Sequence, residues 1–113
     1  MVPSEKTMRE LASRVRELLD LLGDFAHLDV RAYGQHILVE QRRKARARDR
    51  DAVARLTYFG NDAFGLSFHE ARGGWSEVML IAPLGELVPV MTDALVQIHR
   101  APGTAAPLRA DAT

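Results

Sequence analysis

The sequence contains no cysteine. This absence excludes a disulfide framework, a thiolate zinc site and a cysteine nucleophile. No apolar run approaches the roughly 20 residues of a membrane-spanning helix, and the first ten residues, MVPSEKTMRE, lack the apolar segment of a secretory signal. We therefore expect a cytoplasmic protein with no membrane partner.

The chain also has no net charge, because 15 lysines and arginines balance 15 aspartates and glutamates. This balance excludes a wholly polybasic or polyacidic protein. Its 47% hydrophobic and 27% charged residues are typical of a globular domain. The 113 residues suit one domain, which we place at residues 1–100, followed by a disordered tail, Ala101–Thr113, with one large apolar residue.

Residues after Ser4 are predicted to form a helix. Ser4 is the expected N-cap, and Gly23 is expected to end the helix. Apolar side chains recur at steps of three and four residues, at Met8, Leu11, Val15, Leu18, Leu19 and Leu22. Such a stripe covers one side of a helix, which must pack against another element.

A β-hairpin is predicted next, because the apolar residues now alternate with polar ones. Gly34-Gln35 suits a two-residue turn between its strands. With that turn, the expected facing pairs are Ala32 with Ile37, Val30 with Val39, and Asp29 with Glu40. The first two pairs face the core, and the carboxylate pair lies on the opposite, charged side.

Three further strands are predicted between residues 54 and 82. Gly60-Asn61-Asp62 and Arg72-Gly73-Gly74 are turn signals between them. If the first turn has three residues, Tyr58 faces Phe64 and Leu56 faces Leu66. The last strand, Trp75–Ala82, is apolar at nearly every position, so we expect it to be buried on both faces.

A second helix is predicted up to Arg100 by an apolar stripe at Leu84, Leu87, Val88, Met91, Leu95 and Ile98. Pro89 conflicts with the interior of a long helix. We therefore place Pro89 in the first turn, with the regular helix starting near Gly85 to Val88. The expected fold class is α+β: an N-terminal helix, a roughly five-stranded antiparallel meander sheet and a C-terminal helix, with both helices packed on one sheet face.

A basic run separates the first hairpin from the third strand. It contains six cations in nine residues, Arg42, Arg43, Lys44, Arg46, Arg48 and Arg50. Arginine and alanine could support about two turns of helix here, but no apolar stripe is available to dock such a helix. We therefore expect a long hairpin loop, and the short helix remains the alternative. Guanidinium groups bind phosphates, so the run is the candidate site for an anion or nucleic acid.

The sequence contains no spacing typical of a catalytic or metal site. His27, His36, His69 and His99 are spread over separate elements, and none belongs to an H-x-x-x-H pair. His69-Glu70 could form an acid–base or metal-binding pair, but an exposed strand end is the simpler interpretation. Arginines flank the predicted carboxylate pair and should neutralise it. We expect no enzyme activity, no cofactor and no metal.

We therefore expect a small non-catalytic protein-interaction or adaptor domain, acting as a homodimer. Its candidate interface comprises Phe59, Val78 and Leu80, which are apolar residues near the free sheet face or edge. The first alternative is a nucleic-acid-binding module that uses residues 42–50. The second alternative is a small-molecule-binding domain or an enzyme with a pocket between the sheet and the helices.

Overall fold

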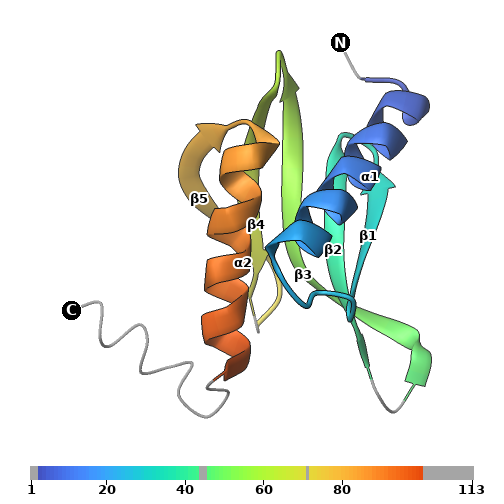
Figure 1. Ribbon diagram of the computed structural model, residues 1–113, viewed down its shortest axis with the longest axis vertical. Coiled ribbons are helices and arrows are strands. Elements are labelled where there is room, and N and C mark those ends of the chain that lie inside the picture. The colour runs from blue at the N-terminus through green and yellow to red at the C-terminus, as the bar shows by residue number, and fades with distance from the viewer. Residues whose placement is uncertain (1–2, 44–45, 71, 101–113) are drawn as a thin grey trace.

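A computed structural model describes residues 3–43, 46–70 and 72–100 of the chain (Figure 1). The elements are α1 (Glu5–Leu22), β1 (Leu28–Tyr33), β2 (His36–Arg43), β3 (Arg46–Gly60), β4 (Ala63–His69), β5 (Trp75–Ala82) and α2 (Leu84–Arg100). The sheet is an antiparallel meander with the order β1-β2-β3-β4-β5. The two helices lie side by side on one sheet face, with α1 over β1 and β2 and α2 over β4 and β5. The predicted fold class is confirmed.

The predicted tail, Ala101–Thr113, lies outside the described residues. In the described part of the chain, no helix is long and apolar enough to cross a membrane.

Helix α1 begins and ends where the sequence predicts. The Ser4 hydroxyl accepts a hydrogen bond of 3.1 Å from the Thr7 N–H, so Ser4 is the N-cap. After Leu22, the N–H of Gly23 still donates to the Leu19 carbonyl. The buried residues of the helix are Met8, Ala12, Val15 and Leu19. This stripe packs on the sheet, as its spacing requires.

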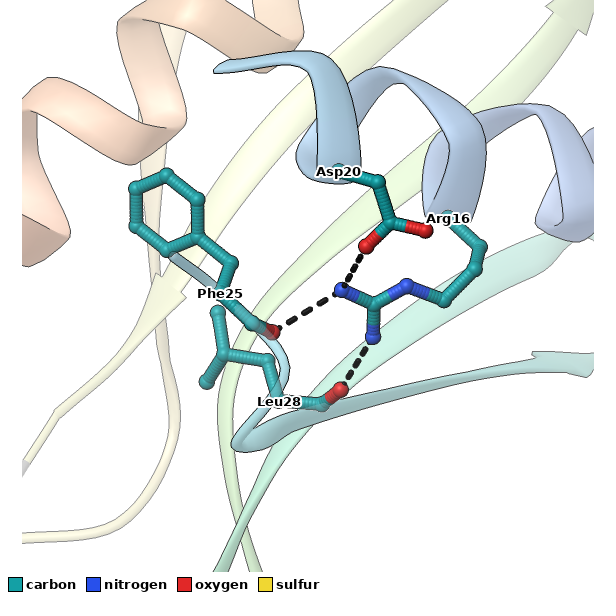
Figure 2. A network of polar contacts seen from close by, with 4 residues as sticks. All are labelled: Arg16, Asp20, Phe25 and Leu28. Carbon is teal, nitrogen blue, oxygen red and sulfur yellow. Dashed lines mark hydrogen bonds and ion pairs between the residues drawn. The ribbon is translucent and has the colours of Figure 1, made fainter. Parts of the chain in front are cut away.

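Arg16 ties α1 to the start of the sheet (Figure 2). Its Nη2 atom donates to the Asp20 carboxylate and to the Phe25 carbonyl, both at 2.9 Å, and Nη1 donates to the Leu28 carbonyl. The Phe25 carbonyl lies in the α1–β1 connection, where it also accepts a hydrogen bond from the N–H of Leu28, the first residue of β1. Arg16 therefore holds the chain as it turns from the helix into β1.

The predicted strand registers are confirmed in both hairpins. The facing pairs of the first are Ala32 with Ile37, Val30 with Val39, and Asp29 with Glu40. The facing pairs of the second are Tyr58 with Phe64 and Leu56 with Leu66. Residues that face the helices form one core, which includes Ile37, Val39, Ala54, Leu56, Phe64 and Leu66 from the sheet. One-residue slips would move these side chains to the opposite face, so burial specifies the register.

The described residues of the basic run are strand rather than loop, which corrects the prediction. Strand β2 continues to Arg43 and β3 begins at Arg46, with Arg42 paired to Arg50 and Arg43 to Arg46. The two strands extend beyond the rest of the sheet as a two-stranded arm (Figure 1). Backbone pairing to the neighbouring strand supplies the hydrogen bonds that a helix would have formed internally, so an apolar stripe is unnecessary.

Strand β5 is exposed, which corrects the prediction that it is buried on both faces. It is an edge strand that pairs with β4 alone. The register also shifts along it: Gly65 pairs with Ile81, whereas Leu66 pairs with Val78. Met79 and Leu80 are left between these pairs, so a bulge turns their side chains outward.

Helix α2 begins earlier than predicted. The Pro83 carbonyl accepts hydrogen bonds from the N–H groups of Glu86 and Leu87, so the helix starts at Leu84 and places Pro89 in its second turn. Proline has no N–H to donate there. The helix nevertheless continues, since its stripe buries Leu84, Leu87, Val88, Met91 and Leu95 in the core.

Candidate functional site

A groove lies on the sheet face opposite the helices, next to β5. The structure brings the three candidate interface residues, Phe59, Val78 and Leu80, together in its lining. The groove has a volume of about 470 Å³ and extends over β3, β4 and β5. Its lining residues are Thr57, Phe59, Gly65, Leu66, Ser67, Glu77, Val78, Met79, Leu80 and Ile81. We call this feature the β5 groove.

Phe59 forms one wall of the β5 groove because Gly65 leaves room for its ring. A Cβ atom at position 65 would lie 2.9 Å from Phe59 Cε2. Gly65 faces Thr57 across the β3–β4 ladder, and no side chain stands between the phenyl ring and the sheet. The ring therefore lies against the sheet while 57% of Phe59 remains exposed.

Sequence reasoning missed two apolar residues of this surface. Met79 is 95% exposed and Ile81 is 65% exposed, which are high values for large apolar side chains. Strict alternation along β5 had placed both on a buried face. The bulge between the Val78 and Ile81 pairings ends that alternation, and no residue in the sequence indicates a bulge there.

Arg55 is the second feature of the open sheet face that sequence reasoning missed. Its guanidinium carbon lies 4.5 Å from the centre of the Trp75 ring, a cation–π contact. The ring of His69 meets the same indole edge-on, with centroids 5.1 Å apart. The Nε atom of Arg55 is buried and has no hydrogen-bond partner. Arg55 directly precedes the core residue Leu56 on β3, so alternation places its side chain on the face opposite the core. That placement was the signal available in the sequence.

In the predicted carboxylate pair of Asp29 and Glu40, the Glu40 carboxylate is bound by Arg31. Arg31 donates to both oxygens of Glu40, at 2.9 and 3.3 Å, and this ion pair raises the pKa of Arg31. The Glu40 side chain is only 8% exposed. Asp29 faces Glu40 along the ladder, but the Arg31 fork already occupies the Glu40 carboxylate. The arrangement favours a structural ion pair over a shared proton or a bound cation.

His36 lies beside Arg55 on the same face. Its Nδ1 atom is 2.8 Å from the Thr57 hydroxyl across the β2–β3 ladder. Burial lowers the pKa of His36, and the positive charge of Arg55 lowers it further. A neutral imidazole is therefore favoured next to this arginine.

The three histidines whose side chains the structure describes do not converge on a metal site. His69 lies at the end of β4 against Trp75, and the ring of His27 lies 6.4 Å from that of Phe25. The side chain of His99 lies outside the described part of the structure. Among described residues, no group of three histidine, aspartate or glutamate side chains could hold a metal ion.

A second cavity of about 510 Å³ opens where the end of α1 approaches α2. It is lined by Leu22, Gly23, Asp24, Phe25, His27, Leu28, Leu95 and Val96. This cavity lies between the two helices and the start of β1, and a further hollow, lined by residues of α1 and β1 such as Ala12 and Val30, also lies between a helix and the sheet. Its lining is mainly apolar, and Asp24 and His27 supply the ionisable groups.

Of the candidate nucleic-acid residues, Arg42, Arg43, Lys44, Arg46, Arg48 and Arg50, the described ones belong to the β2–β3 arm, away from the β5 groove. Their side chains lie outside the described part of the structure, as does the whole of Lys44. The arm and the groove are therefore two separate candidate surfaces.

Comparison of the chain with known proteins found no relative. No protein-family model matches the chain, and neither the curated proteins nor the solved structures gave a significant match.

Proposed function

We propose that this protein is a small non-catalytic protein-interaction domain that self-associates through the β5 groove and the outer edge of β5. The observation that carries this proposal is the exposure of four large apolar side chains in one place. Phe59, Met79, Leu80 and Ile81 are all exposed, and all line the β5 groove. A clustered apolar patch on one face is typical of an interaction site.

A second copy of the chain suits this surface. Edge strands that remain unpaired are commonly protected by lysine, proline, inward-pointing charges or a bulge, and of these β5 has the bulge but no lysine or proline. Strand β5, with the sequence WSEVMLIA, carries Glu77 as its single charged residue. An antiparallel β5–β5 pairing obeys two-fold symmetry, because each copy offers the same strand in the opposite direction. The bulged Met79 and Leu80 would then flank the twofold axis.

Light scattering at tens of micromolar protein tests this proposal. We expect a mass of twice the 12.6 kDa of the chain. The double substitution Met79→Lys, Ile81→Lys should give a monomer, since specific dimers must bury about 1,000 Å² or more and two ammonium groups would be desolvated. Leu21→Lys is the matched control, because Leu21 is 82% exposed on α1, away from β5. A wild-type mass of one chain would overturn the proposal.

A second candidate function, nucleic-acid binding, is supported by the β2–β3 arm. The backbone pairing of Arg42 with Arg50 and of Arg43 with Arg46 makes the basic run a two-stranded ribbon. Such a ribbon fits the width of the major groove of DNA, and its cations would contact phosphates. Asp49 and Asp51 reduce the positive charge of the arm, so we rank this function second.

A further inference from the structure

Strand β1 is the second open edge of the sheet, on the opposite side from β5 (Figure 1). It pairs with β2 alone, and the two-residue turn Gly34-Gln35 joins Tyr33 to His36. Residues that flank such a turn form a hydrogen-bonded pair, and bonded and non-bonded pairs alternate along an antiparallel ladder. The N–H and C=O groups of Ala32 and Val30 therefore point away from the sheet.

Leu28 follows this alternation. Its N–H donates to the Phe25 carbonyl at 3.0 Å, and its carbonyl accepts a hydrogen bond from Arg16, so both groups have partners outside the sheet. Arg16 therefore closes the first part of the edge. The outward groups of Val30 and Ala32 lie further along β1, and they are the backbone positions at which another strand can pair with it.

A hollow of about 780 Å³ lies beside these two residues, between β1 and α1. Ala12 of α1 and Val30 and Ala32 of β1 supply its apolar lining. Both β1 residues pack against the core but are only partly buried, because no further strand covers them. We call this feature the α1–β1 hollow. A strand added to β1 would place every second side chain in it, since side chains alternate between the two faces of a strand.

Four charged residues line the α1–β1 hollow, and two of them already have partners. Arg16 and Arg31 each bind a carboxylate of the chain itself, at 2.9 Å. The other two are Arg9 and Glu17, which form no ion pair with any described residue. The lining thus offers one cation and one anion to a ligand.

The spacing of Arg9 and Glu17 fits an extended chain. Helix α1 rises about 1.5 Å per residue, so these residues lie about 12 Å apart along its axis. A strand covers about 13 Å in four residues, and residues four apart share a face. Arg9 lines a cavity together with Ala32, whereas Arg16, next to Glu17, reaches Leu28. Helix α1 and β1 therefore run in opposite directions along the hollow.

We propose that the open edge of β1 and the α1–β1 hollow bind an extended peptide of a partner protein, which adds a strand antiparallel to β1. The peptide carries an acidic residue and, four positions later, a basic residue, with a small apolar residue midway. The acidic side chain pairs with Arg9, the basic one pairs with Glu17, and the apolar one lies over Ala12. The peptide backbone bonds to the outward groups of Val30 and Ala32.

This proposal does not depend on self-association, because β1 and β5 lie at opposite edges of the sheet. A monomer that binds the peptide contradicts the proposed dimer alone. A dimer that binds no peptide contradicts the present proposal alone. A mass that rises beyond two chains with protein concentration would show that β1 pairs with a strand of another copy, and it would overturn the peptide proposal.

Fluorescence anisotropy with a labelled seven-residue peptide tests the site in the unmodified protein. The matched peptide has glutamate second, valine fourth, lysine sixth and threonine elsewhere. The control peptide has the same composition, with glutamate third and lysine fifth, so that both charges lie on the face opposite the valine. We expect the matched peptide to bind about five- to tenfold more tightly, as two exposed ion pairs allow. Equal affinities, or no binding at millimolar peptide, would overturn the proposal.

Exchange of charges assigns the side-chain contact. Arg9→Glu should weaken binding of the matched peptide about tenfold, and a peptide with lysine in place of its glutamate should prefer this variant to the wild type. Arg14→Glu is the matched control, because it makes the same change at an exposed position of α1 outside the hollow, and binding should persist. If Arg9→Glu, shown to be folded by circular dichroism, binds both peptides as the wild type does, the assignment is wrong.

Backbone measurements distinguish strand addition from side-chain contact. In the free protein, the N–H groups of Val30 and Ala32 should exchange with solvent faster than that of Arg31, which faces β2. Saturating peptide should slow exchange at Val30 and Ala32 at least about tenfold. N-methylation of the peptide valine should abolish binding, whereas N-methylation of the threonine before it should not, since only alternate N–H groups face β1. Unchanged exchange at Val30 and Ala32 would overturn the proposal.

Discussion

The ring of Phe59 lies over Gly65 so closely that a Cβ atom at position 65 would be 2.9 Å from Phe59 Cε2. Replacing Gly65 by alanine should push the ring out of the β5 groove. The ring is the exposed end of a side chain and can rotate away, so we expect the free energy of unfolding to change by no more than about 1 kcal/mol. Self-association through the groove should weaken. NMR of the Phe59 ring protons and light scattering measure these effects.

The double variant Phe59→Ala, Gly65→Ala provides the control. It should behave like Phe59→Ala alone, because no ring remains to be displaced. A loss of stability in Gly65→Ala that persists in the double variant would place the clash elsewhere and contradict this account of the groove wall.

The Arg31–Glu40 ion pair should stabilise the fold because it compensates the charge of the buried Glu40 carboxylate. The carboxylate side chain is 8% exposed, so removing its cation leaves a largely buried charge without a partner. We expect Arg31→Met to lower the free energy of unfolding by about 1–3 kcal/mol in urea titrations. Arg31→Met, Glu40→Leu should recover part of that loss, and Arg14→Met is the exposed control. Equal losses in the single and double variants would show that packing of Arg31, rather than the charge of Glu40, is responsible.

His36 should make the protein less stable in mild acid. Burial and the charge of Arg55 lower its pKa in the folded state, whereas its unfolded value is about 6.5. The unfolded chain therefore binds more protons between the two values. The contribution of neutral His36 to the free energy of unfolding is complete above about pH 6.5. It is lost as the pH falls from there through the pKa of His36 in the folded state.

Comparison with His36→Gln isolates this effect. Between pH 7 and pH 5, the wild type should lose more stability than the variant. In NMR titrations, Arg55→Gln should raise the pKa of His36 toward its ordinary value, because one positive charge has been removed. Parallel stability profiles for wild type and His36→Gln would contradict the prediction.

The β2–β3 arm should not bind duplex DNA more tightly than a non-specific contact, about 10⁻⁴ to 10⁻⁶ M at physiological salt. If binding occurs, its logarithmic salt slope counts the phosphates contacted, at about −0.9 each. Replacing Arg43, Arg46 and Arg48 by alanine should then flatten the slope by about two to three units. Fluorescence anisotropy at several salt concentrations measures both. A sub-micromolar complex abolished by this triple substitution would make nucleic-acid binding the leading function.

Local patterns in the sequence were sufficient for α1 and for the registers of the β1–β2 and β3–β4 hairpins. Ser4 caps a helix through a hydrogen bond three residues away, and Gly34-Gln35 sets which residues of a hairpin face each other. These signals act over a few residues, so they can be read from the chain. Burial on one face then excludes the alternative registers.

Tertiary structure decided the parts of the candidate site that the sequence did not predict. The bulge on β5 exposes Met79 and Leu80, and it arises from how β5 aligns with β4 rather than from a bulge signal in its own residues. The same holds for Arg55, whose contact with Trp75 joins residues twenty positions apart on strands that are not neighbours. The strands of the arm likewise form only because β2 and β3 pair with each other, and no pattern within the basic run predicts that pairing. Alternation assigns a residue to a face, whereas exposure and partners depend on which strand ends the sheet and which side chains lie across it.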